Sequence, residues 1–183
     1  MKVTTLGIDG AWIIETSVHP DSRGIFREWF KRETLNANGL PDFVVKQANT
    51  SISKKGVIRG IHYSEEIQGQ AKLITCTSGS ISDVVLDLRP NSTSFGEHVL
   101  INLNSREGRS IFISSGLGHG FQALEENTVV TYLLDKEYSP ENEFGLNPVD
   151  PELEIRWPIQ EFQISDKDAC AANFKYLKES HVL

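Results

Sequence analysis

Several groups capable of acid–base or electrostatic chemistry stand in otherwise apolar segments of the chain. Arg59 and His62 share the run of residues 57–63, Lys72 is the single charge in residues 71–74, and His119 lies between two glycines. Charged side chains are rarely kept in such segments without a polar partner. An imidazole titrates near neutral pH, and an ammonium stabilises developing negative charge. These residues therefore predict a pocket that handles a proton and binds an anionic ligand.

Each of these residue types also has a structural interpretation. A single histidine in an apolar strand is more often a hydrogen-bonded structural residue than a catalytic one, and tyrosines in strands, such as Tyr132, usually serve packing. The pattern Ser165-x-x-Asp168 is typical of a capping box, in which the carboxylate only closes a helix N-terminus. Arg23 and Glu28 are spaced to form a surface ion pair of little consequence. From the residues alone, both interpretations stay open.

A metal site is the main chemical competitor. Metal-binding barrels usually supply three or four His or carboxylate ligands, often with two histidines one residue apart. The position two after His62 is Ser64, and only Glu65, Glu66 and the distant His119 remain to complete a set. We therefore expect no metal. Gly-x-Ser-x-Gly, P-loop and dinucleotide-binding motifs are absent from the sequence as well, so we expect no cofactor.

The elements that must position these residues are mainly short strands separated by turns. The predicted strands cover residues 11–18, 25–30, 43–53, 57–63, 71–77, 80–88, 98–103, 109–113 and 128–134. Helices are expected only over residues 31–38 and from Ser165 to about Lys178. Short strands with regular turns predict an all-β sandwich or barrel with a few short helices, including one near the C-terminus.

Two details of the strand pattern carry structural expectations. Asp83, Asp87 and Arg89 fall on one face of the strand over residues 80–88, which indicates either a polar barrel interior or a solvent-exposed face. Arg59 and His62 have opposite parity on a regular strand. Both can face one pocket only if the chain bulges between them, and we expect that bulge at Gly60.

Length, charge and cysteine content limit the number of domains, the classes of partner and the cellular compartment that we expect. The 183 residues fit one domain, with no internal repeat or linker. The net charge of −7 and the scattered basic residues argue against nucleic acid and membrane surfaces as partners. No apolar run approaches the ~20 residues that cross a bilayer, no signal peptide is evident, and the two cysteines form no disulfide framework. We expect a cytoplasmic protein, in which an anionic ligand must be held by a few specific cations.

Read together, the ordered motifs resemble the dTDP-4-dehydrorhamnose 3,5-epimerase family. The motifs are Asp21-Ser22-Arg23-Gly24-x-Phe26-x-Glu28, Gln47-Ala48-Asn49-Thr50-Ser51, Arg59-Gly60-Ile61-His62-Tyr63, Gly69-Gln70-Ala71-Lys72, residues 83–89, Ser94-Phe95-Gly96, His119-Gly120-Phe121, Tyr132, Tyr138 and residues 164–168. The likeness extends from about Gly10 to Asp168 and is closest to the actinobacterial branch. It implies a cupin-type jelly roll and a metal-free homodimer that exchanges N-terminal strands.

The resemblance also implies a role for each candidate residue. His62 would be the base, oriented by Asp168, while Lys72 stabilises the enolate oxygen and Tyr132 returns a proton from the opposite face of the sugar. The substrate implied is a dTDP-4-keto-6-deoxy sugar. The binding residues implied are Arg23, Arg59, His119 and Lys167 for the diphosphate, Gln47 and Asn49 as hydrogen-bond donors, Tyr138 and Glu143 at the nucleotide, and Phe26 and Glu28 in the pocket of the second subunit.

Two departures from the family pattern keep alternatives open. Ser64 stands where many members have Gln, and residues 147–151 replace a Trp-Asn-Asp-Pro motif. Neither removes a candidate catalytic group, but related enzymes invert C3 only or C5 only. Two alternatives of another class are a nucleotide-sugar-binding protein without turnover and a metal-dependent cupin oxygenase that uses His62, Glu66 and His119.

Overall fold

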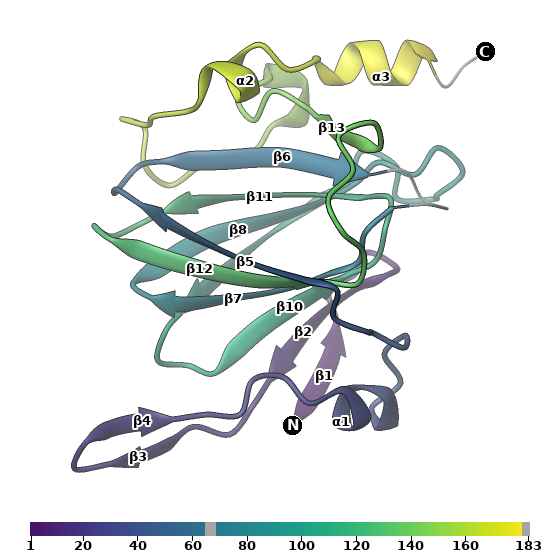
Figure 1. The fold of residues 1–183 in the computed structure, drawn as a ribbon. Coiled ribbons are helices and arrows are strands. Elements are labelled where there is room, and N and C mark those ends of the chain that lie inside the picture. The colour runs from purple at the N-terminus through teal and green to yellow at the C-terminus, as the bar shows by residue number, and fades with distance from the viewer. Residues whose placement is uncertain (65–68, 181–183) are drawn as a thin grey trace.

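Two antiparallel sheets face each other in the computed structural model, which describes residues 1–64 and 69–180 (Figure 1). The six-stranded sheet has the order β1 (Lys2–Thr5), β2 (Ala11–Glu15), β10 (Arg109–Ile113), β7 (Lys72–Ser78), β12 (Thr128–Leu134) and β5 (Gln47–Ser53). The five-stranded sheet has the order β13 (Glu143–Gly145), β6 (Ile58–Ser64), β11 (Leu117–Ala123), β8 (Ser80–Asp87) and β9 (His98–Asn104). The predicted β-sandwich architecture is confirmed.

Three apolar clusters hold the layers together. The first fills the space between the sheets and includes Ile74 and Val130 from one sheet and Val85 and Phe121 from the other. The second joins the outer face of the five-stranded sheet to the C-terminal segment, which contains the 3-10 helix η1 (Pro151–Leu153) and the helices α2 (Asp166–Ala169) and α3 (Phe174–Ser180). The third covers part of the outer face of the six-stranded sheet with the segment that contains α1 (Arg32–Ala37).

Strand β11 did not appear among the predicted strands because its glycines interrupt the alternation of side chains. A Cβ atom on Gly118 would come within 2.8 Å of the Ile61 side chain, and one on Gly120 within 2.9 Å of the Arg59 carbonyl oxygen. Glycine is thus required where β6 presses on β11. The glycines on both sides of His119 therefore permit close approach, and the backbone and side chains of β6 make that approach.

The expected bulge in β6 is confirmed. His62 pairs with His119 and Arg59 pairs with Phe121, so three steps along β6 match two steps along β11. Gly60 lies inside the shift with φ of +103°, a conformation that favours glycine. The bulge reverses the parity of the strand, and as a result Arg59 and His62 face the same side of the sheet.

The C-terminal segment corrects one expectation. The helix expected from Ser165 to about Lys178 is broken into α2 and α3. At the break, the Asn147 N–H donates to the Ala172 carbonyl over 3.0 Å, and the Phe174 N–H donates to the Asp150 carboxylate over 2.6 Å. These contacts outside the helix capture backbone groups that a continuous helix would use internally.

The N-terminal strands also differ from the expectation. Residues 19–24 were expected to form only a turn, but they belong to a hairpin of β3 (His19–Asp21) and β4 (Gly24–Phe26). The strand expected over residues 25–30 ends at Phe26. Figure 1 shows the hairpin extending away from both sheets, and Ile25 and Phe26 in it are 51% and 67% exposed.

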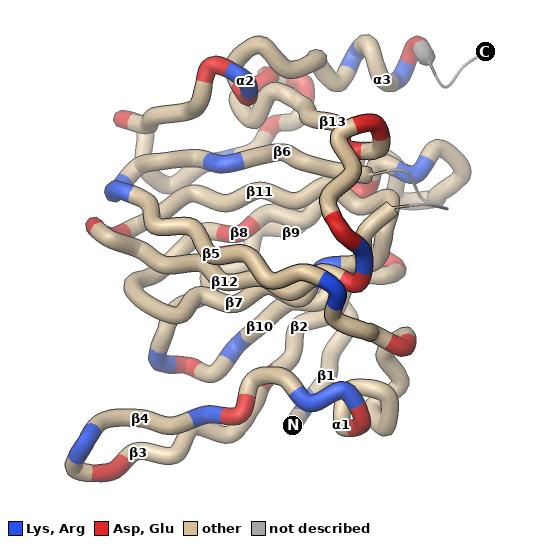
Figure 2. Tube along the Cα trace, viewed as in Figure 1, with Lys and Arg blue, Asp and Glu red and all other residues tan. Residues whose placement is uncertain are grey.

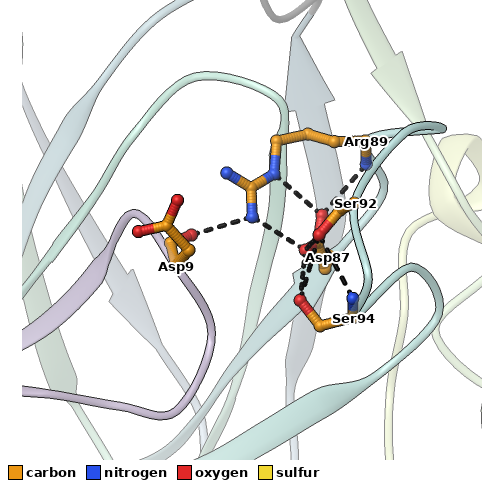
Figure 3. A network of polar contacts seen from close by, with 5 residues as sticks. All are labelled: Asp9, Asp87, Arg89, Ser92 and Ser94. Carbon is orange, nitrogen blue, oxygen red and sulfur yellow. Dashed lines mark hydrogen bonds and ion pairs between the residues drawn. The ribbon is translucent and has the colours of Figure 1, made fainter.

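Two carboxylates on β8 show whether the charged face of this strand lies in the interior or in solvent. Asp83 and Asp87 are both fully buried, so this face of β8 belongs to the interior of the sandwich. Figure 3 shows that Asp87 accepts hydrogen bonds from Arg89, Ser92 and Ser94, and that Arg89 also donates to the Asp9 carbonyl over 2.8 Å. Burial alone would raise the pKa of Asp87, but these donors hold its pKa far below its usual range.

The distribution of charged and apolar residues gives no sign of a single-sign surface or a membrane-spanning helix in the part of the chain that the structure describes. Figure 2 shows acidic and basic residues interspersed along the chain. Within the described ranges, no helix has the length and apolar character needed to span a bilayer.

The Asp87 network yields a prediction about stability. Asp87→Asn should lower the free energy of unfolding by roughly 3 kcal/mol at pH 7, because it leaves a buried guanidinium without its carboxylate. The depressed pKa means that the contribution is complete above about pH 4, the unfolded value, and is lost as the pH falls towards the folded value. Urea unfolding at pH 7 and pH 3 should show a large gap between wild type and variant at pH 7 and a smaller one at pH 3. Asp42→Asn, in the exposed pair with Arg32, is the control and should change stability little.

Candidate active site

A cavity of about 590 Å³ opens where the two sheets separate, between β5 and β12 on one side and β6 and β11 on the other. Among the fourteen residues predicted to form a site, those that line this cavity are His62, Lys72, Tyr132, Asp168, Gln47, Asn49, Arg59, His119, Tyr138, Glu143 and Lys167. Residues separated by more than a hundred positions in the sequence therefore share one cavity. Arg23, Phe26 and Glu28 do not line it.

His62 and Asp168 form an imidazole–carboxylate pair. The distance from His62 Nε2 to Asp168 Oδ1 is 2.8 Å, and the Asp168 side chain is almost fully buried. Burial would raise the pKa of Asp168, but the hydrogen bond and charge of His62, the Ser165 hydroxyl and the Gly60 backbone hold its pKa below the usual value. The carboxylate can therefore only accept, and Nε2 must carry the proton. With Nε2 donating to Asp168, the lone pair of a neutral imidazole lies on Nδ1.

The capping-box pattern at Asp168 is only half used for capping. The Asp168 backbone N–H donates to the Ser165 hydroxyl over 3.1 Å, and this caps α2. The Asp168 carboxylate turns instead to His62. The local cap thus fixes the backbone that carries the carboxylate, and the side chain is free for a tertiary contact.

Lys72 lies at the cavity wall with almost no exposure to solvent. Lys72 is 7% exposed, and its neighbours in the sheet are Ile113 on β10 and Leu134 on β12. Burial lowers the pKa of the Lys72 ammonium, while the charge of Glu143 acts in the opposite direction. Within residues 1–64 and 69–180, no hydrogen bond or ion pair engages its Nζ. A buried ammonium without a partner is suited to an oxygen that develops negative charge.

Tyr132 reaches the cavity from the sheet opposite His62. It lies on β12 beside Asn49 of β5, and its ring packs partly on the apolar cluster between the sheets. His62 is on β6, in the five-stranded sheet. A proton acceptor and a phenol thus approach the same cavity from different walls.

A second imidazole–carboxylate pair lies beside the first. His119 pairs with His62 across the two strands, and its Nε2 lies 2.8 Å from Oδ2 of the buried Asp83. Burial raises the pKa of Asp83, and the pairing with His119 lowers it in part. Asp83 was not among the residues predicted to form the site. The alternation of charged and apolar residues over 80–88 was consistent with a buried Asp83, but it did not indicate which residue would pair with it.

The remaining cavity residues form two polar groups. At one end, Gln47 donates to the Asn49 side chain over 3.0 Å and accepts the Tyr138 backbone N–H over 2.8 Å. At the other, Arg59 donates to the Ser53 hydroxyl over 3.0 Å and to the Ile52 carbonyl. The Arg59 guanidinium is held in place by neutral acceptors, so its charge is available to an anionic ligand.

The three predicted residues outside the cavity lie in or next to the β3–β4 hairpin. Arg23 pairs with Asp21 over 2.6 Å and not with Glu28, which corrects the ion pair considered from the sequence. Arg23, Phe26 and Glu28 are all exposed. Their position on a projecting hairpin leaves their predicted role in a second subunit as a proposal.

The geometry gives no local support to the oxygenase alternative. Among the residues that the structure describes, no three His, Cys, Asp or Glu side chains cluster in a way that could hold a metal ion. Glu65 and Glu66, considered as ligands from the sequence, lie outside the described residues.

Comparison with known proteins identifies the family to which this arrangement belongs. The sequence profile of the dTDP-4-dehydrorhamnose 3,5-epimerase family matches residues 5–176. The chain belongs to the dTDP-4-dehydrorhamnose 3,5-epimerase family. The resemblance predicted from the motifs is confirmed, and the chain is an enzyme of the isomerase class.

Individual members of the epimerase family are close to this chain in sequence and structure. The dTDP-4-dehydrorhamnose 3,5-epimerase of Mycobacterium tuberculosis is 40% identical over 100% of this chain and 92% of its own length. The solved M. tuberculosis epimerase superposes with a TM-score of 0.93 and covers 100% of this chain and 93% of its own. A 3'-monoepimerase from Streptomyces bikiniensis, solved with dTDP-quinovose, has a TM-score of 0.92 at 36% identity, covering 98% of this chain and 91% of its own.

The bulge that aligns the site yields a prediction. In Gly60→Ala, the new Cβ would lie 2.5 Å from the His119 carbonyl oxygen, in addition to the cost of a positive φ. Gly39→Ala is the matched control, because Gly39 also has a positive φ but has open space around it. We expect the control to lose about 1 kcal/mol and Gly60→Ala to lose clearly more in chemical denaturation. Equal losses would show that the contact between β6 and β11 carries no strain.

Proposed function

We propose that the chain is a cofactor-free epimerase of a dTDP-4-keto-6-deoxy sugar, with inversion at C3 and C5 as the leading outcome. The observation that carries the proposal is the meeting of His62, Lys72 and Tyr132 at one cavity, with His62 paired to Asp168. The relatives named above support the substrate class, because their names specify dTDP-linked deoxysugars.

The proposed base is His62. A ketone at C4 acidifies the C–H bonds on both adjacent carbons, so a base of moderate strength can remove either proton. The Nε2–H bond to Asp168 leaves the lone pair on Nδ1, and the carboxylate stabilises the imidazolium that forms. One imidazole beside the ring can serve C3 and C5 in turn, since both lie next to the same carbonyl.

The proposed stabiliser of the enolate is Lys72. Proton removal moves negative charge onto the C4 oxygen, and a buried ammonium stabilises that charge more strongly than water does. Lys72 gains its favourable partner only as the enolate forms, since no described carboxylate pairs with it directly. The interaction therefore favours the transition state over bound substrate.

The proposed acid is Tyr132. Inversion requires that the new proton arrive on the face opposite the one that was lost, and a single group would return it to the same face. Tyr132 and His62 come from different sheets at the same cavity. This arrangement provides the two separate groups that inversion demands.

The same cavity provides for the nucleotide. We assign the diphosphate to Arg59, His119 and Lys167, with Gln47 and Asn49 as hydrogen-bonding residues. Tyr138, which is 52% exposed, is placed to stack on the thymine, with Glu143 beside it. Local cations of this kind explain how a chain of net charge −7 can bind a dianion.

We further propose that the active form is a homodimer in which each hairpin completes the partner's cavity. The exposed Phe26 supports this, because a large apolar side chain on a projecting hairpin gains stability by packing on another surface. Part of the outer face of the six-stranded sheet is also open, with Ile52 64% exposed next to a row of threonine hydroxyls, Thr50, Thr131 and Thr77. Arg23, Phe26 and Glu28 are the residues assigned to the partner's cavity.

A second outcome, inversion at C3 alone, is favoured by one specific comparison. The S. bikiniensis monoepimerase superposes with a TM-score of 0.92, close to the 0.93 of the M. tuberculosis epimerase. The two outcomes share His62, Lys72 and Asp168 and differ in which carbon receives a proton from the opposite face.

Deuterium exchange tests the proposal directly. Incubation with dTDP-4-keto-6-deoxyglucose in deuterated water should place label at C3 and C5, or at C3 alone for the second outcome. His62→Ala should abolish exchange, while Tyr132→Phe should keep some exchange and lose inversion, because removal of the proton does not need the phenol. Tight dTDP binding by the wild type without label on a panel of 4-keto sugars would instead indicate a binding protein without turnover.

The role of Lys72 gives a separate prediction. Lys72→Met should lower kcat by about 10² to 10³, the usual loss for one donor to an oxyanion, with little change in dTDP affinity. Lys55→Met is the control, since Lys55 lies outside the cavity lining and is exposed. Steady-state kinetics with calorimetry of dTDP binding separates the two parameters. A variant that loses binding and keeps kcat would place Lys72 at the diphosphate.

A further inference from the structure

Arg27 has its guanidinium docked on the six-stranded sheet against neutral acceptors. It donates to the Thr75 hydroxyl over 2.6 Å, to the Cys76 carbonyl over 3.3 Å and to the Arg109 carbonyl over 3.5 Å. In the part of the chain that the structure describes, it forms no ion pair. Burial lowers the pKa of the Arg27 guanidinium. A cation held only by neutral acceptors is poorly explained by stability, since a neutral side chain avoids the desolvation cost.

The position of Arg27 links it to the hairpin. We call residues 17–26, which contain β3 and β4, the arm. At the start of the arm, the Thr16 backbone N–H donates to the Gly108 carbonyl over 2.9 Å. At its end, Arg27 reaches the carbonyl of the next residue, Arg109. Both roots of the arm are therefore tied to adjacent residues at the start of β10, and the arm projects from that point (Figure 1).

Arg27 and the residues on either side of it differ in exposure to solvent. Arg27 is partly buried on its own sheet, whereas Phe26 before it and Glu28 after it are exposed. Arg27 follows the last residue of β4, so its docked side chain stands between two neighbours that remain exposed. The rigid, planar fork of arginine can hold acceptors on two strands, β7 and β10, at once.

We propose that Arg27 is a positioning residue that fixes the root of the arm, so that Arg23, Phe26 and Glu28 reach the substrate bound in the partner subunit. The inference rests on the proposed function and adds to it a residue of the arm's own subunit. Arg27 does not line the cavity of its own chain. Because Arg27 restricts the arm before the substrate binds, less conformational entropy of the arm is lost on binding.

The first test is kinetic. Arg27→Met keeps an unbranched side chain of similar length but has no donors, and it should raise KM roughly tenfold while kcat stays within about twofold. Arg27→Lys keeps the charge but lacks the planar fork, so its KM should lie between the values for wild type and Arg27→Met. Arg32→Met, which removes an exposed ion pair with Asp42, should match wild type. Sedimentation and thermal melting check that each variant stays dimeric and folded, and a KM unchanged in Arg27→Met would overturn the inference.

The second test asks in which subunit Arg27 acts. In a mixed dimer of His62→Asn and Arg27→Met chains, the cavity that keeps His62 receives the arm of the His62→Asn chain, whose Arg27 is intact. At a substrate concentration below the KM of Arg27→Met, the mixture should be more active than either parent. Absence of recovery would show that Arg27 acts within its own cavity or through general stability, and would overturn the proposal.

The design separates this inference from the proposed function. If wild type fails to place deuterium at C3 or C5 of the keto sugars, the proposed function fails. If wild type exchanges normally and the Arg27 variants show neither the KM change nor the recovery, only the inference fails. Hydrogen exchange on the arm gives a readout independent of activity, since Arg27→Met should speed exchange in residues 17–26 and leave β7 unchanged.

Discussion

The close approach of β6 to β11 is the constraint on which the site depends. Glycines at positions 60, 118 and 120 remove the side chains that would hold the two strands apart. The resulting bulge brings Arg59 and His62 to one side and sets His62 opposite His119. It also places the Gly60 backbone beside Asp168, where it helps to keep that carboxyl ionised. A single backbone irregularity thus aligns a proposed base, its carboxylate and two proposed ligands of the diphosphate.

Electrostatics in the cavity follow from which charges are paired and which are not. Asp168 is paired with an imidazole and accepts further hydrogen bonds, while Lys72 is buried and has no direct partner among the residues that the structure describes. Paired groups keep their charge, whereas burial of an ammonium is costly unless a counter-charge lies beside it. In the proposed mechanism, the enolate oxygen supplies that counter-charge to Lys72. The protein thereby concentrates positive charge at a few points in a chain that is acidic overall.

The sequence was sufficient for the architecture and for eleven of the residues that line the cavity, and it failed where tertiary contacts override local pattern. Alternation and turns revealed most of the strands, and the opposite parity of Arg59 and His62 predicted the bulge at Gly60. β11 was missed because glycine spacing, set by the packing of Ile61, hides its alternation. Asp83 was missed because its partner lies on another strand. The break after α2 depends on Asp150 and Asn147, which no helix pattern includes.

The long separation between His62 and Asp168, 106 positions, has a consequence for folding. The carboxylate is carried on a layer that packs outside the five-stranded sheet, so both sheets can pair before it docks. A chain arrested at that point would have its strands in register and an imidazole with no fixed tautomer. The contact that fixes the tautomer of His62, the proposed base, therefore depends on docking of the C-terminal layer and not on the pairing of the strands.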